Sequence, residues 1–125
     1  MFIDREKRKS ISKNLRARIK TKTNGLCGYC GLVLPNRWHV DNVYPICNGG
    51  ADNYENMVAS CPQCNNYKSV FSVEQFRAII EGQCEQLSRY STNYKFAIKY
   101  ELITVNVIAI IFYFEILGIK FKIKH

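Results

Sequence analysis

Acidic residues are scarce in this sequence. Its 125 residues include 10 Asp and Glu against 18 Lys and Arg, which gives a formal net charge of +8 and a pI of about 9.3. A small chain with this excess of positive charge favours a polyanionic partner, either nucleic acid or an anionic membrane. The apolar content of 47% argues against a disordered chain, so we expect one folded domain with a small appendage.

The sequence also lacks a segment that could anchor it in a membrane. Its most apolar stretch, Leu102 to Phe114, reads LITVNVIAIIFYF and contains Asn106, whereas a membrane-spanning helix needs about 20 apolar residues. The β-branched and aromatic residues of this stretch favour a buried strand, which we place at 107–116. The charged start MFIDREKRKS lacks the apolar segment of a signal peptide, so we expect a cytoplasmic protein of a bacterium or a phage-infected cell.

Cysteine is plentiful by comparison, and four of the six cysteines form two Cys-x-x-Cys pairs. In a chain without secretory features this pattern favours a zinc site over disulfides, although two disulfides or redox pairs remain the alternatives. Four thiolates satisfy the tetrahedral preference of zinc and leave no open position, so the zinc would be structural. Residues 31–60 would form a small unit between the two pairs. The zinc ligands are Cys27, Cys30, Cys61 and Cys64, and the remaining thiols are Cys47 and Cys84, the latter in a helix core.

Basic residues are concentrated in the stretch REKRKSISKNLRARIKTK, residues 5–22. Ile11, Leu15 and Ile19 recur every four residues, which predicts a helix over about 7–20 that stops near Asn24-Gly25. Its charged face is either solvated or bound to phosphates, and the concentration of charge favours phosphate binding. The candidate DNA-binding residues are Arg16, Arg18 and Lys20, together with Arg37.

The rest of the chain predicts a small set of elements. Residues 38–44 are expected to be extended, and Pro62 is expected to open a short helix. Ser72 and Gln75 form a capping-box pattern before a longer helix, VEQFRAIIEGQCEQLSRY, and a further amphipathic piece spans about 92–102. We therefore expect a basic N-terminal helix at 1–24, a zinc-supported core at 25–80, and a helical and strand extension at 81–125.

Five polar residues accompany the cysteine pairs: His39, Asp41, Asn42, Asn56 and Asn65. Each alone fits an ordinary turn or capping residue. The order Cys-x-x-Cys, His-Val-Asp-Asn-Val-Tyr-Pro, Gly-Gly, Asn-Met and Cys-x-x-Cys-Asn-x-x-Lys resembles the zinc-supported HNH endonucleases. The resemblance covers about residues 24–80, and FYFE at 112–115 is similar to a C-terminal segment of some phage and bacterial members. It implies an α+β fold with a ββα-metal core, one structural zinc, flanking helices and a C-terminal strand.

The resemblance also implies roles for individual residues. Asp41 and Asn65 match the family's two ligands of a catalytic divalent ion, Mg²⁺ or Mn²⁺. Asn56 matches the asparagine that pins a loop and helps to orient the general base. Such an ion would contact the scissile phosphate and stabilise the leaving oxygen. Lys68 joins the basic residues as a candidate contact to the DNA backbone.

One position departs from the family. Where the family has a histidine as general base, this sequence has Asn42, whose amide cannot accept a proton near neutral pH. His39 does not obviously replace it, because an alternating strand puts residues 39 and 41 on one side and residue 42 on the other. His39 is instead a candidate to touch the metal or the phosphate, and His125 is the last residue. Three explanations are open: a degenerate enzyme, a base supplied from elsewhere, and a His-to-Asn substitution that traps a complex. The otherwise intact motif favours the last.

The leading interpretation is therefore an HNH-type endonuclease that hydrolyses DNA phosphodiester bonds in a phage, restriction or defence setting, impaired by Asn42. A catalytically silent, zinc-stapled DNA-binding module is the alternative. A zinc-ribbon module for protein interactions is a third reading, and it would lack salt-sensitive DNA binding. We expect DNA and no membrane as the partner. The sequence leaves open the cleavage site, nicking versus double-strand cleavage, and a homodimer.

Overall fold

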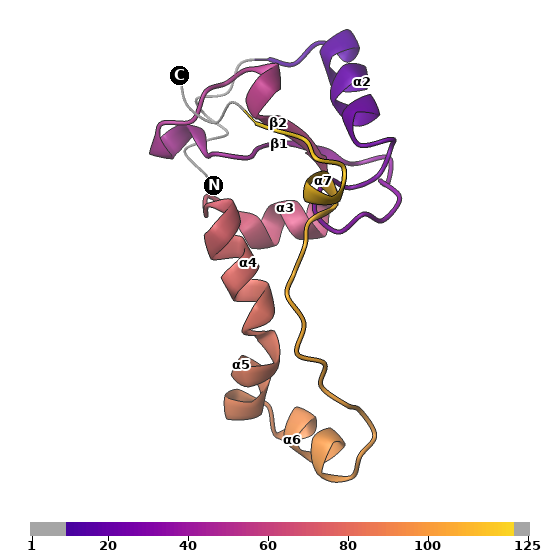
Figure 1. Cartoon of the computed structure of the whole chain (residues 1–125), viewed down its shortest axis with the longest axis vertical. Coiled ribbons are helices and arrows are strands. Elements are labelled where there is room, and N and C mark those ends of the chain that lie inside the picture. Colours follow the sequence, from indigo (N-terminus) through magenta and orange to yellow (C-terminus); the bar gives the residue numbers. More distant parts are fainter. Residues whose placement is uncertain (1–9, 122–125) are drawn as a thin grey trace. The chain divides into compact units, whose positions relative to one another are not determined.

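A computed structural model describes residues 10–121 (Figure 1). The chain divides into two compact units, and each is described by itself. One unit runs up to Val73 and includes the segment from Ile111 onward; the other is Glu74–Ile110. No helix in the described residues combines the length and apolar character needed to cross a membrane.

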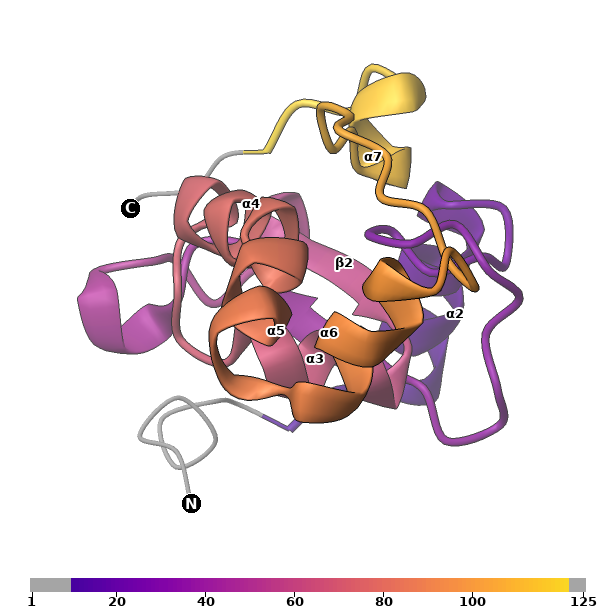
Figure 2. The same ribbon diagram turned by 90° about the horizontal axis from the view of Figure 1, so that it is seen from below.

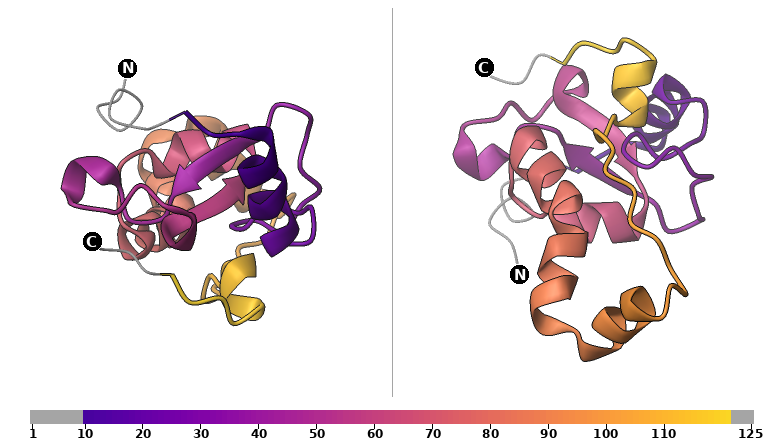
Figure 3. Two further views of the ribbon diagram at one scale, coloured as in Figure 1. Left: turned by 90° about the horizontal axis from the view of Figure 1, so that it is seen from above. Right: turned by 60° about the horizontal axis from the view of Figure 1, so that its bottom comes forward.

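A β-hairpin forms the centre of the first unit. Strand β1 (His39–Asn42) pairs antiparallel with β2 (Met57–Ser60), and the register places Asp41 opposite Val58. All four residues of β2 are buried, so this strand contributes most of its side chains to the core. The mixed fold with a small antiparallel sheet confirms the predicted α+β class. Figure 3 shows the two strands side by side with helix α2 along them.

The loop between the strands contains two 3₁₀ turns, η1 (Ile46–Asn48) and η2 (Tyr54–Asn56). Gly50 is needed for a close approach, because a Cβ atom there would lie 1.8 Å from the Tyr44 carbonyl oxygen. Gly49 adopts a φ of 92°, in the left-handed region. The predicted Gly-Gly loop therefore has a steric reason: it brings the chain back against the end of β1.

Helix α2 (Lys13–Lys22) packs on β2 and buries Ile19. It starts later than the predicted residue 7, because the Ser12 hydroxyl accepts a hydrogen bond from the Leu15 amide and caps the helix there. Residues 7–9 lie outside the described residues. The predicted stop is confirmed, since Asn24 and Gly25 both adopt positive φ just after the helix.

Helix α3 (Pro62–Lys68) follows β2 directly, with Pro62 in its first turn as predicted. Cys61 is the N-cap residue, and its sulfur accepts a hydrogen bond from the Cys64 amide at 3.4 Å. The cysteine pair thus belongs to the start of the helix. Lys68, at the end of this helix, reaches Asp41 of β1, and Asn65 lies one turn earlier in the helix.

The C-terminal part of the first unit returns to the turn at Cys27 to Cys30. The backbone amides of Tyr113 and Phe114 donate to the carbonyl oxygens of Tyr29 and Gly28, at 3.0 and 2.8 Å. Phe112 and Phe114 are buried, and each lies edge-on to the Tyr29 ring. This contact joins the FYFE segment, residues 112–115, to the Cys27–Cys30 turn.

The predicted strand at 107–116 is wrong. Residues 104–112 have no regular structure, and Tyr113–Ile116 form the short helix α7. The Phe112 amide donates to the Glu115 carboxylate at 2.8 Å, which fixes the first turn of α7. An apolar, β-branched composition predicted burial in a sheet, but no strand partner for it occurs within residues 10–121.

The second unit is helical. Helix α4 (Val73–Glu81) leads into α5 (Gln83–Tyr90), and α6 (Thr92–Lys99) contacts α5 (Figure 2). The single helix predicted over this stretch is broken at Gly82, a residue of poor helix propensity. The amphipathic piece predicted at 92–102 is confirmed as α6, capped by the Ser91 hydroxyl. Cys84 is half-buried, so it contributes to a helix contact.

Candidate metal and nuclease site

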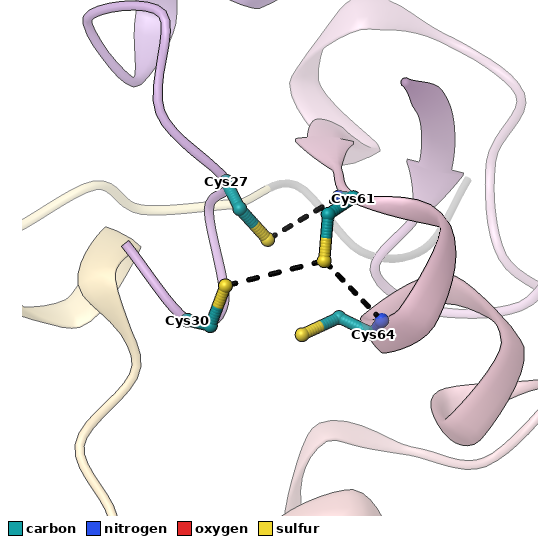
Figure 4. Close-up of side chains that lie close together, drawn as sticks. All are labelled: Cys27, Cys30, Cys61 and Cys64. Atoms are coloured by element: carbon teal, nitrogen blue, oxygen red, sulfur yellow. Dashed lines mark hydrogen bonds between the residues drawn. The ribbon is translucent and has the colours of Figure 1, made fainter. Parts of the chain in front are cut away.

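Four cysteine sulfurs converge at one point, all within 4.8 Å of one another. Figure 4 shows that two come from the turn before β1 and two from the start of α3. The Sγ atoms of Cys30 and Cys61 are 4.0 Å apart, which is too far for a disulfide. None of the six cysteines takes part in a disulfide. The cluster joins segments that the sequence separates by residues 31–60, as the zinc prediction required.

The protonation of these thiols indicates that the cluster is suited to a cation. A hydrogen bond from Cys64 lowers the pKa of Cys27 to about 4. Burial raises the pKa of Cys30 to about 11, and the hydrogen bond with Cys27, together with burial, raises the pKa of Cys64 further. Without a metal, the packed sulfurs favour one thiolate beside neutral thiols, because like charges repel. A dication that binds four thiolates relieves this conflict, and the donor set is compatible with zinc.

The turn that carries Cys27 and Cys30 is fixed against β2. A Cβ atom at Gly28 would lie 2.2 Å from Val58 Cγ2, so only glycine permits this approach. The Gly28 amide donates to the Ala59 carbonyl oxygen at 2.8 Å. Hydrogen bonds and packing therefore hold the first cysteine pair next to the strand that leads into the second.

Asp41, the predicted ligand of a catalytic ion, lies beside the cysteine cluster. Its Oδ2 atom accepts a hydrogen bond from the Tyr29 hydroxyl and lies 3.2 Å from the Lys68 ammonium group. Lys68 also donates to the Asn42 carbonyl oxygen at 3.3 Å. Burial raises the pKa of Tyr29 well above its ordinary value, so the phenol remains a proton donor. The carboxylate is thus held by one residue of the Cys27–Cys30 turn and one residue of α3.

Asn42 and Asn56, the two central asparagines of the motif, meet at one backbone carbonyl. Asn56 Nδ2 donates to the Ala51 oxygen at 2.7 Å, and Asn42 Nδ2 donates to the same oxygen at 3.2 Å. Asn56 also exchanges two hydrogen bonds of 2.9 Å with the backbone of Tyr44. Asn56 therefore ties both ends of the loop together.

His39 and Asn65 complete the set of predicted polar residues. His39 is half-buried at the start of β1, opposite Ser60. The strand alternation puts it on the same side as Asp41 and away from Asn42. Asn65 follows Cys64 in α3 and is half-buried. The ββα frame thus carries His39 and Asp41 on one strand and Asn65 on the helix that contacts this strand.

The predicted DNA-binding residues fall into two groups. Arg18, Lys20 and Arg37 are exposed. Arg16 lies over the Trp38 ring, 3.9 Å from its centre, and donates to the Trp38 carbonyl oxygen, so it supports the fold. Lys68 has an exposed fraction of 0% and pairs with Asp41. The prediction that Lys68 contacts the DNA backbone does not agree with this burial, because its ammonium group cannot reach a phosphate.

Two residues with evident roles were not singled out from the sequence. Tyr29 lies between the two cysteines of the first Cys-x-x-Cys pair. An aromatic residue at this position could have indicated, from the sequence alone, a side chain buried in the core. Lys22 donates to the carbonyl oxygens of Tyr54 and Met57, both at 2.8 Å. Burial lowers the pKa of Lys22 to about 8. Nothing local distinguished Lys22 from the other basic residues of its helix.

The hairpin, the helix that follows it and the cysteine cluster define a ββα-metal core. The family model of the HNH endonucleases matches residues 27–71, the segment that contains this hairpin, both cysteine pairs and the polar residues of the motif. This part of the chain therefore resembles an HNH endonuclease domain. Comparisons with curated proteins and with solved structures gave no match.

Proposed function

We propose that this domain is a metal-dependent phosphodiesterase that acts on DNA and that Asn42 makes it slow. The observation that carries the proposal is the match of the HNH family model to a segment in which Asp41, Asn56 and Asn65 lie in the ββα frame around a cysteine cluster. The proposal includes a structural zinc held by Cys27, Cys30, Cys61 and Cys64.

Asp41 and Asn65 would hold the catalytic ion, Mg²⁺ or Mn²⁺. Carboxylate and amide oxygens are ligands that such hard cations accept, and Mg²⁺ commonly keeps several waters beside one or two protein ligands. The side-chain oxygens of Asp41 and Asn65 are therefore of the type that suits this ion. Lys68 lies close enough to Asp41 to neutralise part of the carboxylate charge. When bound, the ion would neutralise charge on the scissile phosphate and stabilise the leaving oxygen.

The hydrogen bond of the Asn42 side chain suggests how a histidine at this position would act as a general base in other members of the family. Its side-chain nitrogen donates to the Ala51 carbonyl oxygen. An imidazole placed there could donate one ring N–H to that carbonyl and leave the other nitrogen free to accept a proton from water. Asn42 makes the same anchoring contact but offers no basic nitrogen, so it keeps the structure and lacks the proton acceptor.

The DNA contact is proposed for the exposed basic residues of the first unit. Lys13, Arg18 and Lys20 lie on α2, and Arg37 precedes β1. Their charges can bind phosphates without reading a sequence. The proposed partner agrees with the net charge of +8.

A plasmid-nicking assay tests the proposal. The protein should bind plasmid and nick it slowly or not at all with Mg²⁺ or Mn²⁺. Asn42→His should accelerate metal-dependent nicking by about 10² to 10⁴, the usual contribution of a general base. Asn42→His combined with Asp41→Asn should be inactive again. The matched control is His39→Ala in the unaltered protein, which should change little; efficient cutting that His39→Ala abolishes would make His39 the base.

The second candidate is a silent, zinc-stapled DNA-binding module. The buried pairing of Lys68 with Asp41 favours it, because an internal cation already balances the carboxylate that a divalent ion would use. Under this alternative Asn42→His stays inert while DNA binding persists. Isothermal titration with Mn²⁺ separates the two, since the module needs no second metal beyond zinc.

A further inference from the structure

Helix α6 presents a face of two aromatic and two basic residues to solvent. Lys95, Phe96 and Lys99 lie on one side of the helix, and Tyr100 follows at its end. Phe96 and Tyr100 are 52% and 66% exposed. The opposite side is half-buried, and α6 contacts α5. These four residues are called the α6 face below.

The two rings of the α6 face are stacked with each other. The Phe96 and Tyr100 rings are nearly parallel, with an interplanar angle of 8° and centres 6.0 Å apart. The Lys99 ammonium group lies 5.9 Å from the centre of the Phe96 ring. A flat apolar ligand with a negative group nearby would find both a stacking surface and a countercharge here.

The two lysines of the α6 face keep their charge for a partner. The carboxylate nearest in the chain is the exposed Glu101, which directly follows Tyr100. Within residues 10–121 no ion pair joins Lys95 or Lys99 to a carboxylate. An anionic ligand would therefore meet two lysines that are not in an ion pair at this face.

We propose that the α6 face binds unpaired bases of a single DNA strand, with Phe96 and Tyr100 stacking on bases and Lys95 and Lys99 contacting phosphates. Aromatic platforms beside basic residues are the common means of holding single strands. A duplex offers its bases already stacked on one another, so it would use the lysines and not the rings. The inference rests on the proposed function, because it names a second contact with the same class of partner.

Fluorescence anisotropy of the full chain with labelled oligo-dT and with a duplex of equal length tests the proposal. Phe96→Ala with Tyr100→Ala should weaken oligo-dT binding by about tenfold or more, the order expected when stacking on one or two bases is lost. Binding of the duplex should change less than about twofold. Lys95→Ala with Lys99→Ala should weaken both and reduce their salt dependence.

Matched variants separate stacking from loss of apolar surface or of structure. Phe96→Tyr with Tyr100→Phe keeps both rings and should bind oligo-dT like the unaltered protein, whereas Phe96→Leu with Tyr100→Leu should not. Val107→Ala removes an apolar side chain that is 97% exposed and outside the α6 face, and it should have no effect. Because all these side chains are exposed, the variants should keep their zinc content and helical circular dichroism.

Three results would overturn the proposal. The first is oligo-dT binding that is absent from the unaltered protein or unchanged in the double alanine variant. The second is an equal loss of duplex binding. The third is a difference in oligomeric state, measured by sedimentation, between the unaltered protein and the double alanine variant. Such a difference would mean that the α6 face is a contact between protein chains. If Asn42→His cuts DNA while the double alanine variant binds oligo-dT normally, this inference alone fails. If Asn42→His is inert but oligo-dT binding depends on the two rings, the nuclease proposal fails and this one stands.

Discussion

The Lys68 ammonium group lies 3.2 Å from Asp41 Oδ2, and the side chains are 0% and 8% exposed. Tyr29 donates to the same carboxylate oxygen. The carboxylate expected to serve the catalytic ion is therefore oriented by residues of the Cys27–Cys30 turn and of α3, the two segments that also supply the four cysteines. Folding of the cysteine cluster and placement of Asp41 are consequences of the same packing.

Lys68→Met should destabilise the protein by about 3–5 kcal/mol, because it leaves the buried Asp41 carboxylate without its countercharge. Urea denaturation of the zinc-loaded protein measures the loss. Asp41→Asn with Lys68→Met should recover most of the stability, since no uncompensated charge remains. The exposed Lys95→Met is the control and should change stability by less than about 0.5 kcal/mol. A single Lys68→Met variant as stable as this control would show that the pair contributes nothing.

The features that sequence reasoning predicted correctly are those with local causes. Pro62 begins a helix and Asn24-Gly25 ends one because of their own backbone preferences, and the Cys-x-x-Cys spacing is a property of the ligand turn itself. The burial of Lys68 has no local cause. It depends on where α3 packs against β1, so a lysine that looks like a surface charge becomes a core residue.

The segment after residue 102 shows that a strand, like the burial of Lys68, cannot be predicted from local sequence alone. Its β-branched residues predicted extended, buried structure, but strand formation also requires a hydrogen-bonding neighbour. The stretch is followed by the short helix α7. The start of this helix is fixed by the hydrogen bond from the Phe112 amide to Glu115 and by the contact of the Phe112 ring with the Tyr29 ring. The tyrosine is far away in sequence, so the apolar pattern alone could not indicate this outcome.

Loss of one cysteine of the cluster should unfold the segment of residues 27–71 that matches the HNH family model. Cys61→Ser removes a sulfur at the N-cap of α3 and leaves three thiols, so zinc affinity and the folding free energy linked to it should both be lost. Mass spectrometry of the native protein should give one zinc per chain, and strong chelators should abolish its cooperative unfolding. Cys47→Ser and Cys84→Ser are matched controls, because both thiols lie outside the cluster. A folded, zinc-free protein would contradict the structural role of the metal.

Lys22 should make stability rise with pH in the alkaline range. Burial lowers its pKa from 10.5 to about 8 in the folded protein. Between these values the unfolded state binds more protons, so the free energy of unfolding increases as pH rises from about 8 to 10.5. Because Lys22 is only half-buried, screening by solvent should limit the gain to about 1 kcal/mol. Urea denaturation at several pH values measures it. Lys22→Arg keeps a donor for the carbonyl oxygens of Tyr54 and Met57 but does not titrate, so the difference in slope between the two proteins isolates this residue.

The exposed lysines of α2 should set the salt dependence of duplex binding. Each lysine–phosphate contact contributes about 0.9 to the slope of log K against log salt concentration. Lys13→Ala with Lys20→Ala should therefore reduce the slope by up to about 1.8, with little loss of stability because both side chains are exposed. Fluorescence anisotropy with a short duplex over a range of salt concentrations measures the slope.

Two further variants make this result specific to α2. Arg89→Ala also removes one positive charge, but that arginine is paired with Glu85 on α5, so the slope should stay the same. Arg16→Ala should lower stability through its contact with Trp38 and alter the slope less than the lysine pair does. A different result would be a slope that Lys13→Ala with Lys20→Ala leaves unchanged while Arg37→Ala reduces it. In that case the DNA contacts the segment before β1, which contains Arg37, and not α2. A slope that none of these variants changes would place the duplex on another surface of the protein.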